Sequence, residues 1–290
     1  MVNNLVRPGI EIFVTPSASH IAPGIDGAKR AYVSKTFSDG EKYVRVEDRV
    51  EGSVWVIANT NPPADNLLEL FFLLDALRRL TADISLFIPY FAYARQDRVT
   101  HRGEGLSAKV ISDFLKYFEL RKVVVLHIHS RMIKNYLDYE DLFPLDLISP
   151  LVRQADAVVA PDKGGIPFAR MVGEECGLPV IHTEKKRITE EKVEVIEVSG
   201  EVKGKRVMIV DDMIATGGTI IEATEKLLSE GAREVEVYAT HGIFSGNARE
   251  RIEKSPIRQI YVTNSLPQIE GGKVKVLDIS PLILNIIKSS

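Results

Sequence analysis

One stretch of this chain constrains its fold more than any other, residues 207–219 with the sequence VMIVDDMIATGGT. It begins with four apolar residues, three of them β-branched, which is typical of a buried strand. Two aspartates, Asp211 and Asp212, stand where this strand is expected to end, and a small-residue turn follows. Apolar residues then recur at helical spacing as far as Leu228. The stretch therefore predicts a strand, a glycine-rich loop and a helix.

The loop in this stretch has the composition of an anion site. Its glycines allow backbone N–H groups to approach a phosphate, and the dipole of the following helix favours negative charge. Two carboxylates beside such a loop need a separate role, either accepting hydrogen bonds from sugar hydroxyls or binding Mg²⁺. The stretch therefore predicts a site for a phosphorylated sugar. A tight turn with acidic surface residues is the structural alternative.

The composition is that of an ordinary globular protein with one or two domains. Of the 290 residues, 45% are hydrophobic and 27% are charged, and the formal net charge is −3, which gives no reason to expect nucleic acid. The single cysteine, Cys176, cannot form an internal disulfide, which suits a reducing compartment. No signal peptide is apparent, and the most apolar stretch, residues 67–80, is short and carries four charged side chains. We expect a cytoplasmic protein without a nucleic-acid or membrane partner.

Strand and helix patterns alternate along the chain. The expected strands are residues 54–58, 84–88, 123–128, 157–160, 180–183, 207–210 and 235–240, and the expected helices are residues 65–80, 106–118, 166–176 and 220–230. This alternation predicts an α/β fold with a mainly parallel sheet and right-handed connections. Gly231 is expected to end the last helix. Residues 10–43 indicate only short strands and a small helix, and residues 188–204 suggest a hairpin arm.

Two parts of the chain are similar to each other. Residues 54–59 (VWVIAN) align without gaps with residues 207–212 (VMIVDD), and the helices and strands that follow also match. In the first copy Ala58 and Asn59 replace the two aspartates, and PADN replaces the TGGT of the loop. This predicts two similar α/β units, of which only the second keeps a phosphate loop. A coincidence between two strand–helix–strand units is the alternative to an internal duplication.

Four other clusters contain polar groups that a nucleotide reaction needs. They are residues 37–41 (FSDGE), residues 95–97 (RQD), the pair His127 and His129 followed along the chain by residues 162–165 (DKGG), and residues 185–187 (KKR). An aromatic ring with Arg and Gln nearby can hold an adenine and its phosphates, although a solvated loop is the alternative for the arginines. The two histidines would share one face of a strand, which suits a metal or phosphate site. The three cations form either a local phosphate site or a surface charge run.

Together these motifs resemble those of the ribose-phosphate diphosphokinases, also called phosphoribosyl pyrophosphate synthetases. In chain order the motifs are FSDGE at 37–41, DNLLEL at 65–70, IPYFAYARQD at 88–97, PDKGG at 161–165, KKR at 185–187, residues 207–219 and THGIFSG at 240–246. The resemblance runs from about residue 35 to residue 290. Residues 207–219 alone indicate only the wider phosphoribosyltransferase group, whereas the combination with FSDGE and YARQD is specific.

The resemblance implies a fold and a reaction. The fold is α/β, with two phosphoribosyltransferase-like domains at residues 1–146 and 147–290, each a mainly parallel sheet flanked by helices; packing of the last helix on the first domain is an open option. The reaction is transfer of the β,γ-diphosphoryl group of Mg-ATP to the anomeric hydroxyl of ribose 5-phosphate, with release of AMP. The resemblance also implies a homo-oligomer, either a dimer or a hexamer.

The resemblance also implies a role for each site residue. The ATP-binding residues would be Phe37, Asp39, Gly40, Glu41, Arg95, Gln96 and Asp97, partly from a neighbouring subunit. The ribose 5-phosphate residues would be Arg187, Asp211, Asp212, Ala215, Thr216, Gly217, Gly218 and Thr219. His129 and Asp162 would bind Mg²⁺, the implied cofactor, and Lys185 with Arg187 would be catalytic by stabilising the transferring group.

The chain departs from the family pattern at a few positions. His127 and Ala215 each stand where many members have Asp, but the backbone N–H groups of the loop remain, so we expect the loop to bind phosphate. Residues 98–105 also differ from the common bacterial form, so regulation by phosphate or nucleotides is not carried over. A base phosphoribosyltransferase and a catalytically silent regulatory paralogue are the alternative functions.

Overall fold

The structure is a computed structural model that describes residues 9–29, 32–47, 49–187 and 194–290. Residues 188–193 of the expected hairpin arm lie outside this description, as do the side chains of residues 29, 185–187 and 194–195. The chain forms two compact units. Unit 1 comprises Met1–Phe143, Ser265–Pro267 and Asp278–Ser290, and unit 2 comprises Pro144–Asn264 and Gln268–Leu277. The division therefore falls close to the expected boundary at 146/147, and two C-terminal segments belong with the first unit.

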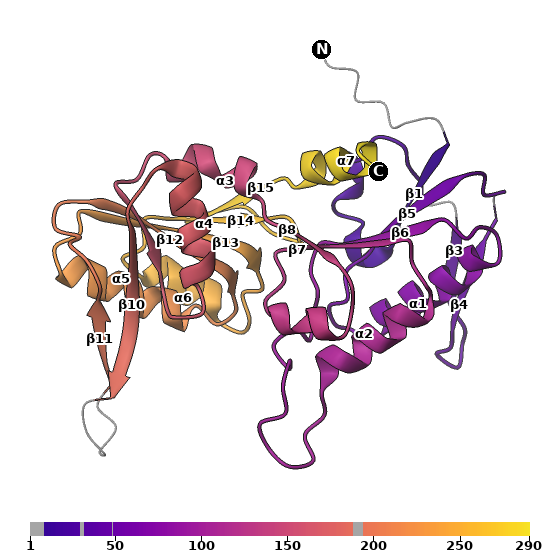
Figure 1. The fold of residues 1–290 in the computed structure, drawn as a ribbon, viewed down its shortest axis with the longest axis horizontal. Helices are drawn as coiled ribbons and strands as arrows, with labels where there is room; N and C mark the ends of the chain where they lie inside the picture. The colour runs from indigo at the N-terminus through magenta and orange to yellow at the C-terminus, as the bar shows by residue number, and fades with distance from the viewer. Residues whose placement is uncertain (1–8, 30–31, 48, 188–193) are drawn as a thin grey trace. The chain divides into compact units, whose positions relative to one another are not determined.

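Unit 1 is built on a six-stranded sheet with the order β2-β1-β5-β6-β7-β8, in which all neighbours are parallel. The strands are β1 (Ile10–Val14), β2 (Ala28–Lys29), β5 (Ser53–Ile57), β6 (Ile84–Ile88), β7 (Lys122–Leu126) and β8 (Glu140–Leu142). Helices α1 (Asp65–Arg78) and α2 (Ser107–Tyr117) lie on one side of this sheet and α7 (Ser280–Lys288) on the other (Figure 1). The antiparallel hairpin of β3 (Tyr32–Thr36) and β4 (Lys42–Val46) packs beside α1. Short 3-10 helices are η1 (Pro16–Ala18), η2 (Ala22–Gly24) and η3 (Arg131–Asn135).

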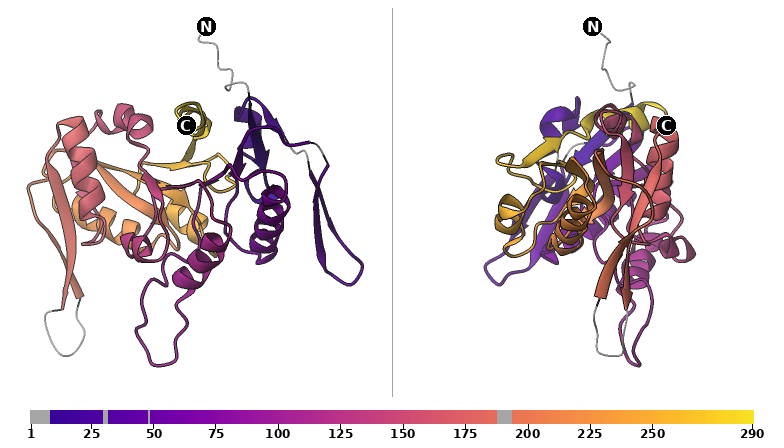
Figure 2. Two further views of the ribbon diagram at one scale, coloured as in Figure 1. Left: turned by 45° about the vertical axis from the view of Figure 1, so that its right-hand side comes forward. Right: turned by 90° about the vertical axis from the view of Figure 1, so that its left-hand side faces the viewer.

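Unit 2 is built on a seven-stranded sheet with the order β11-β10-β9-β12-β13-β14-β15, parallel except for the β10–β11 pair. The strands are β9 (Ala157–Ala160), β10 (Val180–Arg187), β11 (Glu194–Val198), β12 (Arg206–Ile214), β13 (Glu234–Gly242), β14 (Gln259–Thr263) and β15 (Val274–Leu277). The helices are α3 (Leu145–Val152), α4 (Ile166–Cys176), α5 (Gly218–Ser229) and α6 (Ala248–Lys254). Helices α3 and α4 lie on one side of the sheet and α5 and α6 on the other (Figures 1 and 2).

Central strands such as β5 (SVWVI), β6 (ISLFI) and β9 (AVVA) are apolar on successive residues because helices cover both faces of each sheet. In unit 1, Val54 and Val56 of β5 belong to the core under α1 and α2, while Trp55 between them is also fully buried. In unit 2, Val237 of β13 packs into the core under α5, and Tyr238 lies on the α4 side, with its ring centroid 6.3 Å from that of Phe168. Side chains of successive residues in one strand thus pack on opposite faces of the sheet.

The two sheets share one strand order. The run β1-β5-β6-β7-β8 of unit 1 corresponds in sequence and in space to the run β9-β12-β13-β14-β15 of unit 2. Helix α1 follows β5 as α5 follows β12, and an additional antiparallel hairpin precedes both β5 and β12. The similarity expected from residues 54–59 and 207–212 therefore extends to the whole topology, which an internal duplication explains.

Several expected elements match the structure and others differ from it. Strands β6 and β9 and helix α4 have the expected bounds. Strand β12 was expected to end before Asp211, but pairing with β13 continues it to Ile214. Helices α3 and α6 and strands β14 and β15 were not predicted, because each is short and lacks a long periodic pattern. No helix within the described ranges is long and apolar enough to cross a membrane.

Candidate active site

The predicted phosphate loop, residues 215–219, connects β12 to α5. Gly217 has a φ of +77°, a left-handed conformation that glycine adopts readily, and it precedes the first helical residue, Gly218. The side chains of Thr216 and Thr219 are exposed. The loop thus leads directly into a helix amino end, whose first N–H groups have no partner within the helix and can bind an anion.

Asp211 and Asp212 are half-buried residues at the carboxyl end of β12. The N–H of Asp212 donates a hydrogen bond to Oδ1 of Asp211 at 2.9 Å. Burial, and after it the negative charges of Asp212 and Asp162, raise the pKa of Asp211 well above its ordinary value. Asp211 is therefore repelled by two neighbouring negative charges, and hydroxyl donors or a cation would relieve this repulsion.

Asp162 brings a third carboxylate from the end of the neighbouring strand β9. Its side chain is exposed, and its Oδ1 accepts a hydrogen bond from the N–H of Gly165 at 3.0 Å. Strands β9 and β12 are parallel neighbours, and the charge of Asp162 acts on Asp211. The carboxyl ends of the two strands therefore bring these acids close together, in the place where parallel sheets usually bind ligands.

The donor chemistry at Asp162 fits Mg²⁺. No group of three or more His, Cys, Asp and Glu side chains that could hold a metal occurs among the described residues. However, Mg²⁺ usually keeps several waters and binds through one or two carboxylates together with substrate phosphates. The exposed carboxylate of Asp162, with Asp211 close enough to feel its charge, meets that requirement, because the substrate would complete the coordination.

The two histidines do not share a strand face, so that expectation was wrong. Strand β7 ends at Leu126, and the backbone leaves the extended conformation at His127, which has a φ of +40°. The His127 ring is buried against Phe143, with ring centroids 5.0 Å apart, whereas His129 is exposed. Strand alternation does not apply beyond the strand, and only His129 is accessible to a ligand.

The FSDGE motif is the tip of the β3–β4 hairpin. The N–H of Phe37 donates to the carbonyl of Glu41 at 2.8 Å, and Gly40 has a φ of +95°. The N–H of Glu41 also donates to Oδ1 of Asp39 at 3.1 Å. Phe37 is 44% exposed and carries the Lys35 ammonium 4.8 Å from its ring centroid. The tip therefore presents an open aromatic face with a cation beside it.

The RQD motif lies in the loop between β6 and α2. Arg95 and Gln96 are exposed, but Asp97 is buried, and its Oδ2 accepts a hydrogen bond from Oγ of Ser130 at 2.6 Å. Burial by itself would raise the pKa of Asp97, but the hydrogen bonds from Ser130 and Arg98 outweigh it and the net pKa is lowered. Asp97 thus links the Arg95 loop to the residue that follows His129.

The KKR motif belongs to the last part of β10, which extends beyond the expected end at residue 183. The backbone of Lys185 pairs with that of Ile196, and the backbone of Arg187 pairs with that of Glu194 of β11. The side chains of Lys185 and Arg187 lie outside the described part of the structure. Their roles stay predictions.

Sequence reasoning assigned no role to a buried acid that supports the hairpin tip. Glu69 of α1 is only 3% exposed, accepts a hydrogen bond from the Tyr32 hydroxyl at 3.0 Å and lies 3.6 Å from Lys42 Nζ. These contacts attach β3 and β4 to α1 and so hold Phe37 in place. The signal was present, because Glu69 stands among the leucines of the buried helix face.

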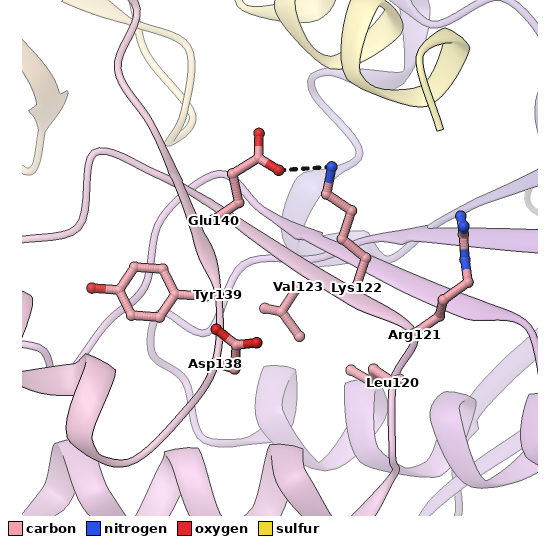
Figure 3. Close-up of a pocket in the computed structure, with 7 residues that line it drawn as sticks. All are labelled: Leu120, Arg121, Lys122, Val123, Asp138, Tyr139 and Glu140. Atoms are coloured by element: carbon pink, nitrogen blue, oxygen red, sulfur yellow. Dashed lines mark ion pairs between the residues drawn. The ribbon is translucent and has the colours of Figure 1, made fainter.

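A separate pocket lies at the amino ends of two strands of the unit 1 sheet. It has a volume of about 300 Å³ and opens beside Lys122 and Glu140, the first residues of β7 and β8. Figure 3 shows these two side chains pointing toward each other, and their charged atoms are 2.7 Å apart. Because the candidate site residues lie beyond the carboxyl ends of the strands, this pocket is not part of the candidate site.

Comparisons with known proteins agree with the motifs. Residues 15–118 match the model of the N-terminal domain of ribose phosphate pyrophosphokinase, and residues 167–289 match that of the phosphoribosyl synthetase-associated domain. The ribose-phosphate pyrophosphokinase of Aquifex aeolicus is 39% identical over 262 residues, covering 86% of this chain and 84% of the relative. That of Vibrio parahaemolyticus is 37% identical over 302 residues, covering 97% and 96%.

A solved structure extends the agreement to the fold. The phosphoribosylpyrophosphate synthetase from Mycobacterium smegmatis superposes with a TM-score of 0.86 at 30% identity, covering 97% of this chain and 98% of that one. The α/β fold is therefore matched over nearly the whole chain. The chain belongs to the ribose-phosphate pyrophosphokinase family.

Proposed function

We propose that this enzyme transfers the β,γ-diphosphoryl group of Mg-ATP to the anomeric hydroxyl of ribose 5-phosphate. The observation that carries the proposal is the β12–α5 connection, where a phosphate loop lies next to Asp211 and Asp212 in a chain of this family. An anion cradle beside acceptor groups suits a ligand that has both a phosphate and free hydroxyls.

The acceptor substrate is assigned to unit 2. The N–H groups of residues 215–219 bind the 5-phosphate, and the carboxylates of Asp211 and Asp212 accept hydrogen bonds from the ribose hydroxyls. Burial and neighbouring acids disfavour the charged form of Asp211. Hydrogen bonds from the incoming hydroxyl groups stabilise this charged form. The two acids therefore select a sugar and do not transfer the diphosphoryl group.

The donor substrate is assigned to the exposed motifs of unit 1. The open face of Phe37 stacks on the adenine, and Arg95 and Gln96 bind polar groups of the nucleotide, with Asp39, Gly40 and Glu41 at the hairpin tip completing the contacts. Asp97 is buried, and its role is to hold the loop that contains Arg95. Part of this set comes from a neighbouring subunit, in a homo-oligomer.

The reaction is an in-line substitution at the β-phosphorus. The anomeric hydroxyl of the sugar gives up its proton to solvent as its oxygen forms the new O–P bond. The bond from the β-phosphorus to the α,β-bridging oxygen breaks, and AMP leaves with that oxygen. Lys185 and Arg187 neutralise charge on the non-bridging oxygens, which is the main requirement of phosphoryl transfer. When bound at His129 and Asp162, Mg²⁺ supplies further neutralisation of the phosphate charge.

Both alternative functions are weaker. A base phosphoribosyltransferase would need the phosphate loop but not unit 1, whose match to the family model covers residues 15–118. A catalytically silent paralogue would not need to retain Lys185, Arg187, His129 and Asp162, and all four are present. We further propose that the enzyme works in the cytoplasm, where its single cysteine stays reduced.

One assay separates the three functions. The purified protein is mixed with Mg-ATP and ribose 5-phosphate, and AMP is measured together with controls that lack either substrate. AMP formation that requires both substrates supports the proposal. Product that appears only with a nucleobase and phosphoribosyl pyrophosphate would identify a transferase instead. No product in either assay would favour the silent paralogue.

A further inference from the structure

Three successive carbonyl groups at the start of the phosphate loop accept hydrogen bonds from one neighbouring segment of unit 2. The carbonyl of Ile214 accepts from the N–H groups of Ile243 and Phe244 at 2.9 and 3.1 Å, that of Ala215 from the N–H of Ser245 at 2.9 Å, and that of Thr216 from Nη1 of Arg251 at 3.2 Å. The donors all come from residues 243–251, which follow β13 and include most of α6. This segment therefore holds the loop from one side.

Peptide geometry converts these contacts into an orientation of the loop. In a trans peptide the carbonyl and the next N–H point in opposite directions. Holding the carbonyls of residues 214–216 toward the segment 243–251 thus directs the N–H groups of residues 215–217 away from it. An anion cradle needs converging N–H groups, and a carbonyl oxygen facing a phosphate would repel it.

Among the described donors to these carbonyls, Arg251 is the only side chain, so substitution can test it. Its Nη2 lies 3.9 Å from the position that a Cβ on Gly218 would occupy, so the guanidinium reaches the start of α5. Arg249, two residues earlier in the chain, has other partners: it donates to Oε1 of Gln268 at 2.9 Å, and its guanidinium lies over the ring of Phe244 at 4.5 Å. Arg251 therefore supports the third carbonyl, next to the left-handed Gly217.

We propose that Arg251 is a positioning residue for the phosphate loop and that it acts by its hydrogen bond to the Thr216 carbonyl. This inference rests on the proposed function, because it assumes that the loop binds the 5-phosphate. Without that bond the peptide between Thr216 and Gly217 can rotate, and its N–H no longer points into the cradle. The glycine at 217 makes this rotation easy, since it allows many backbone conformations.

The test compares one substitution that removes the donor with one that keeps a donor of similar reach. Arg251→Met removes the N–H donors and the charge, whereas Arg251→Lys keeps both. The dissociation constant of ribose 5-phosphate is measured by calorimetry without nucleotide, at low and at raised salt, and that of Mg-ATP without sugar. We expect Arg251→Met to weaken ribose 5-phosphate binding about tenfold at both salt concentrations, the usual size for one charge-assisted hydrogen bond, and to leave Mg-ATP binding unchanged. Arg251→Lys is expected to recover most of the affinity.

The matched control is Arg258→Met, which removes an exposed arginine of the same unit that pairs with Glu234. It is expected to bind ribose 5-phosphate as the wild type does. A loss in Arg251→Met that disappears at raised salt would overturn positioning in favour of long-range charge. Equal weakening by Arg251→Met and Arg251→Lys would overturn the role of the hydrogen bond, and wild-type affinity in both variants would overturn any role. In those cases the wild type still binds the sugar, whereas a wild type that does not bind it overturns the proposed function itself.

Discussion

The connection after β5 and the connection after β12 occupy the same place in two units with the same strand order, yet only one has the features of a phosphate site. In unit 2 the strand leads to Asp211 and Asp212 and then to the glycines before α5. In unit 1 the aligned residues are Ala58 and Asn59, followed by Pro62 and Pro63 where unit 2 has Ala215 and Thr216. Proline has no N–H, so two potential donors of the cradle are missing.

The polar group that remains in the unit 1 connection serves the fold. Asn59 is fully buried, and its amide nitrogen donates to the carbonyls of Ser17 and Ser265 at 3.2 and 2.8 Å. Its Oδ1 accepts from the N–H of Tyr90 at 2.7 Å. At the amino end of α1, the Asp65 carboxylate supplies the negative charge that an anion would otherwise supply. The comparison indicates that a few residues decide whether this supersecondary position serves internal cohesion, as in unit 1, or the ligand site that we propose for unit 2.

The test with the largest expected effect replaces Asn59 by aspartate, the residue at the aligned position of unit 2, Asp212. Asn59→Asp would replace the amide donor by an anion facing the carbonyls of Ser17 and Ser265 in a buried place. We expect a loss of about 3–5 kcal/mol of stability, the usual cost of an uncompensated buried charge. Chemical denaturation of the purified variant measures it.

Two further variants complete this test. Asn285→Asp, at an exposed position of α7, is the control for the same chemical change and is expected to be nearly neutral. The reverse substitution, Asp212→Asn, is expected to keep the fold and weaken ribose 5-phosphate binding. Equal stabilities of Asn59→Asp and wild type would show that Asn59 is not a structural group.

The second test concerns β10 and its counterpart β2, the strands next to β9 and β1 in the two sheets. Strand β10 reaches Arg187, whereas β2 has only the described residues Ala28 and Lys29, so the described part of β2 offers no counterpart of Lys185. Because charge neutralisation is the main catalytic requirement, we predict that Lys185→Ala lowers turnover about 10²–10³-fold while ribose 5-phosphate still binds. Steady-state AMP formation and calorimetry of the sugar measure the two effects. Unchanged turnover would remove Lys185 from the catalytic group.

The smallest expected effect is a pH dependence at the connection after β12 that the connection after β5 lacks. Burial, together with Asp212 and Asp162, raises the pKa of Asp211, whereas the aligned Ala58 does not titrate. A raised pKa in the folded state means that stability falls as the pH rises from the ordinary carboxyl value toward the raised one. Asp211→Asn is therefore expected to be more stable than wild type at neutral pH.

The raised pKa of Asp211 also affects the binding of ribose 5-phosphate. Protonated Asp211 loses acceptor capacity, so ribose 5-phosphate binding is expected to weaken as the pH falls through the raised pKa, and this dependence is expected to disappear in Asp211→Asn. Calorimetry at several pH values checks it, with Mg-ATP as the control ligand. Parallel pH curves for wild type and variant would assign the dependence to another group.

Much of the fold followed from local sequence patterns. Buried strands such as residues 84–88 and 157–160 are short apolar runs bounded by turn residues, and helix 166–176 ends before a glycine, so their bounds matched. The extension of β12 through Asp211 and the turn at His127 did not follow, because pairing with a neighbouring strand and packing against Phe143 decide them. Neither partner is close in sequence.

For the site, the sequence alone determined the chemistry: which residues carry acids, cations and glycines, and in what order, because motifs are local and specify side-chain types. Only the tertiary structure decided how each group is placed. It buried Asp97 against Ser130, exposed His129 while burying His127, and brought Arg251 to the Thr216 carbonyl. Burial and hydrogen bonding between segments distant in the chain depend on how strands and helices pack, and no single motif contains that information. The loop at residues 215–219 was identifiable from sequence; the direction of its N–H groups depends on the segment that supports it.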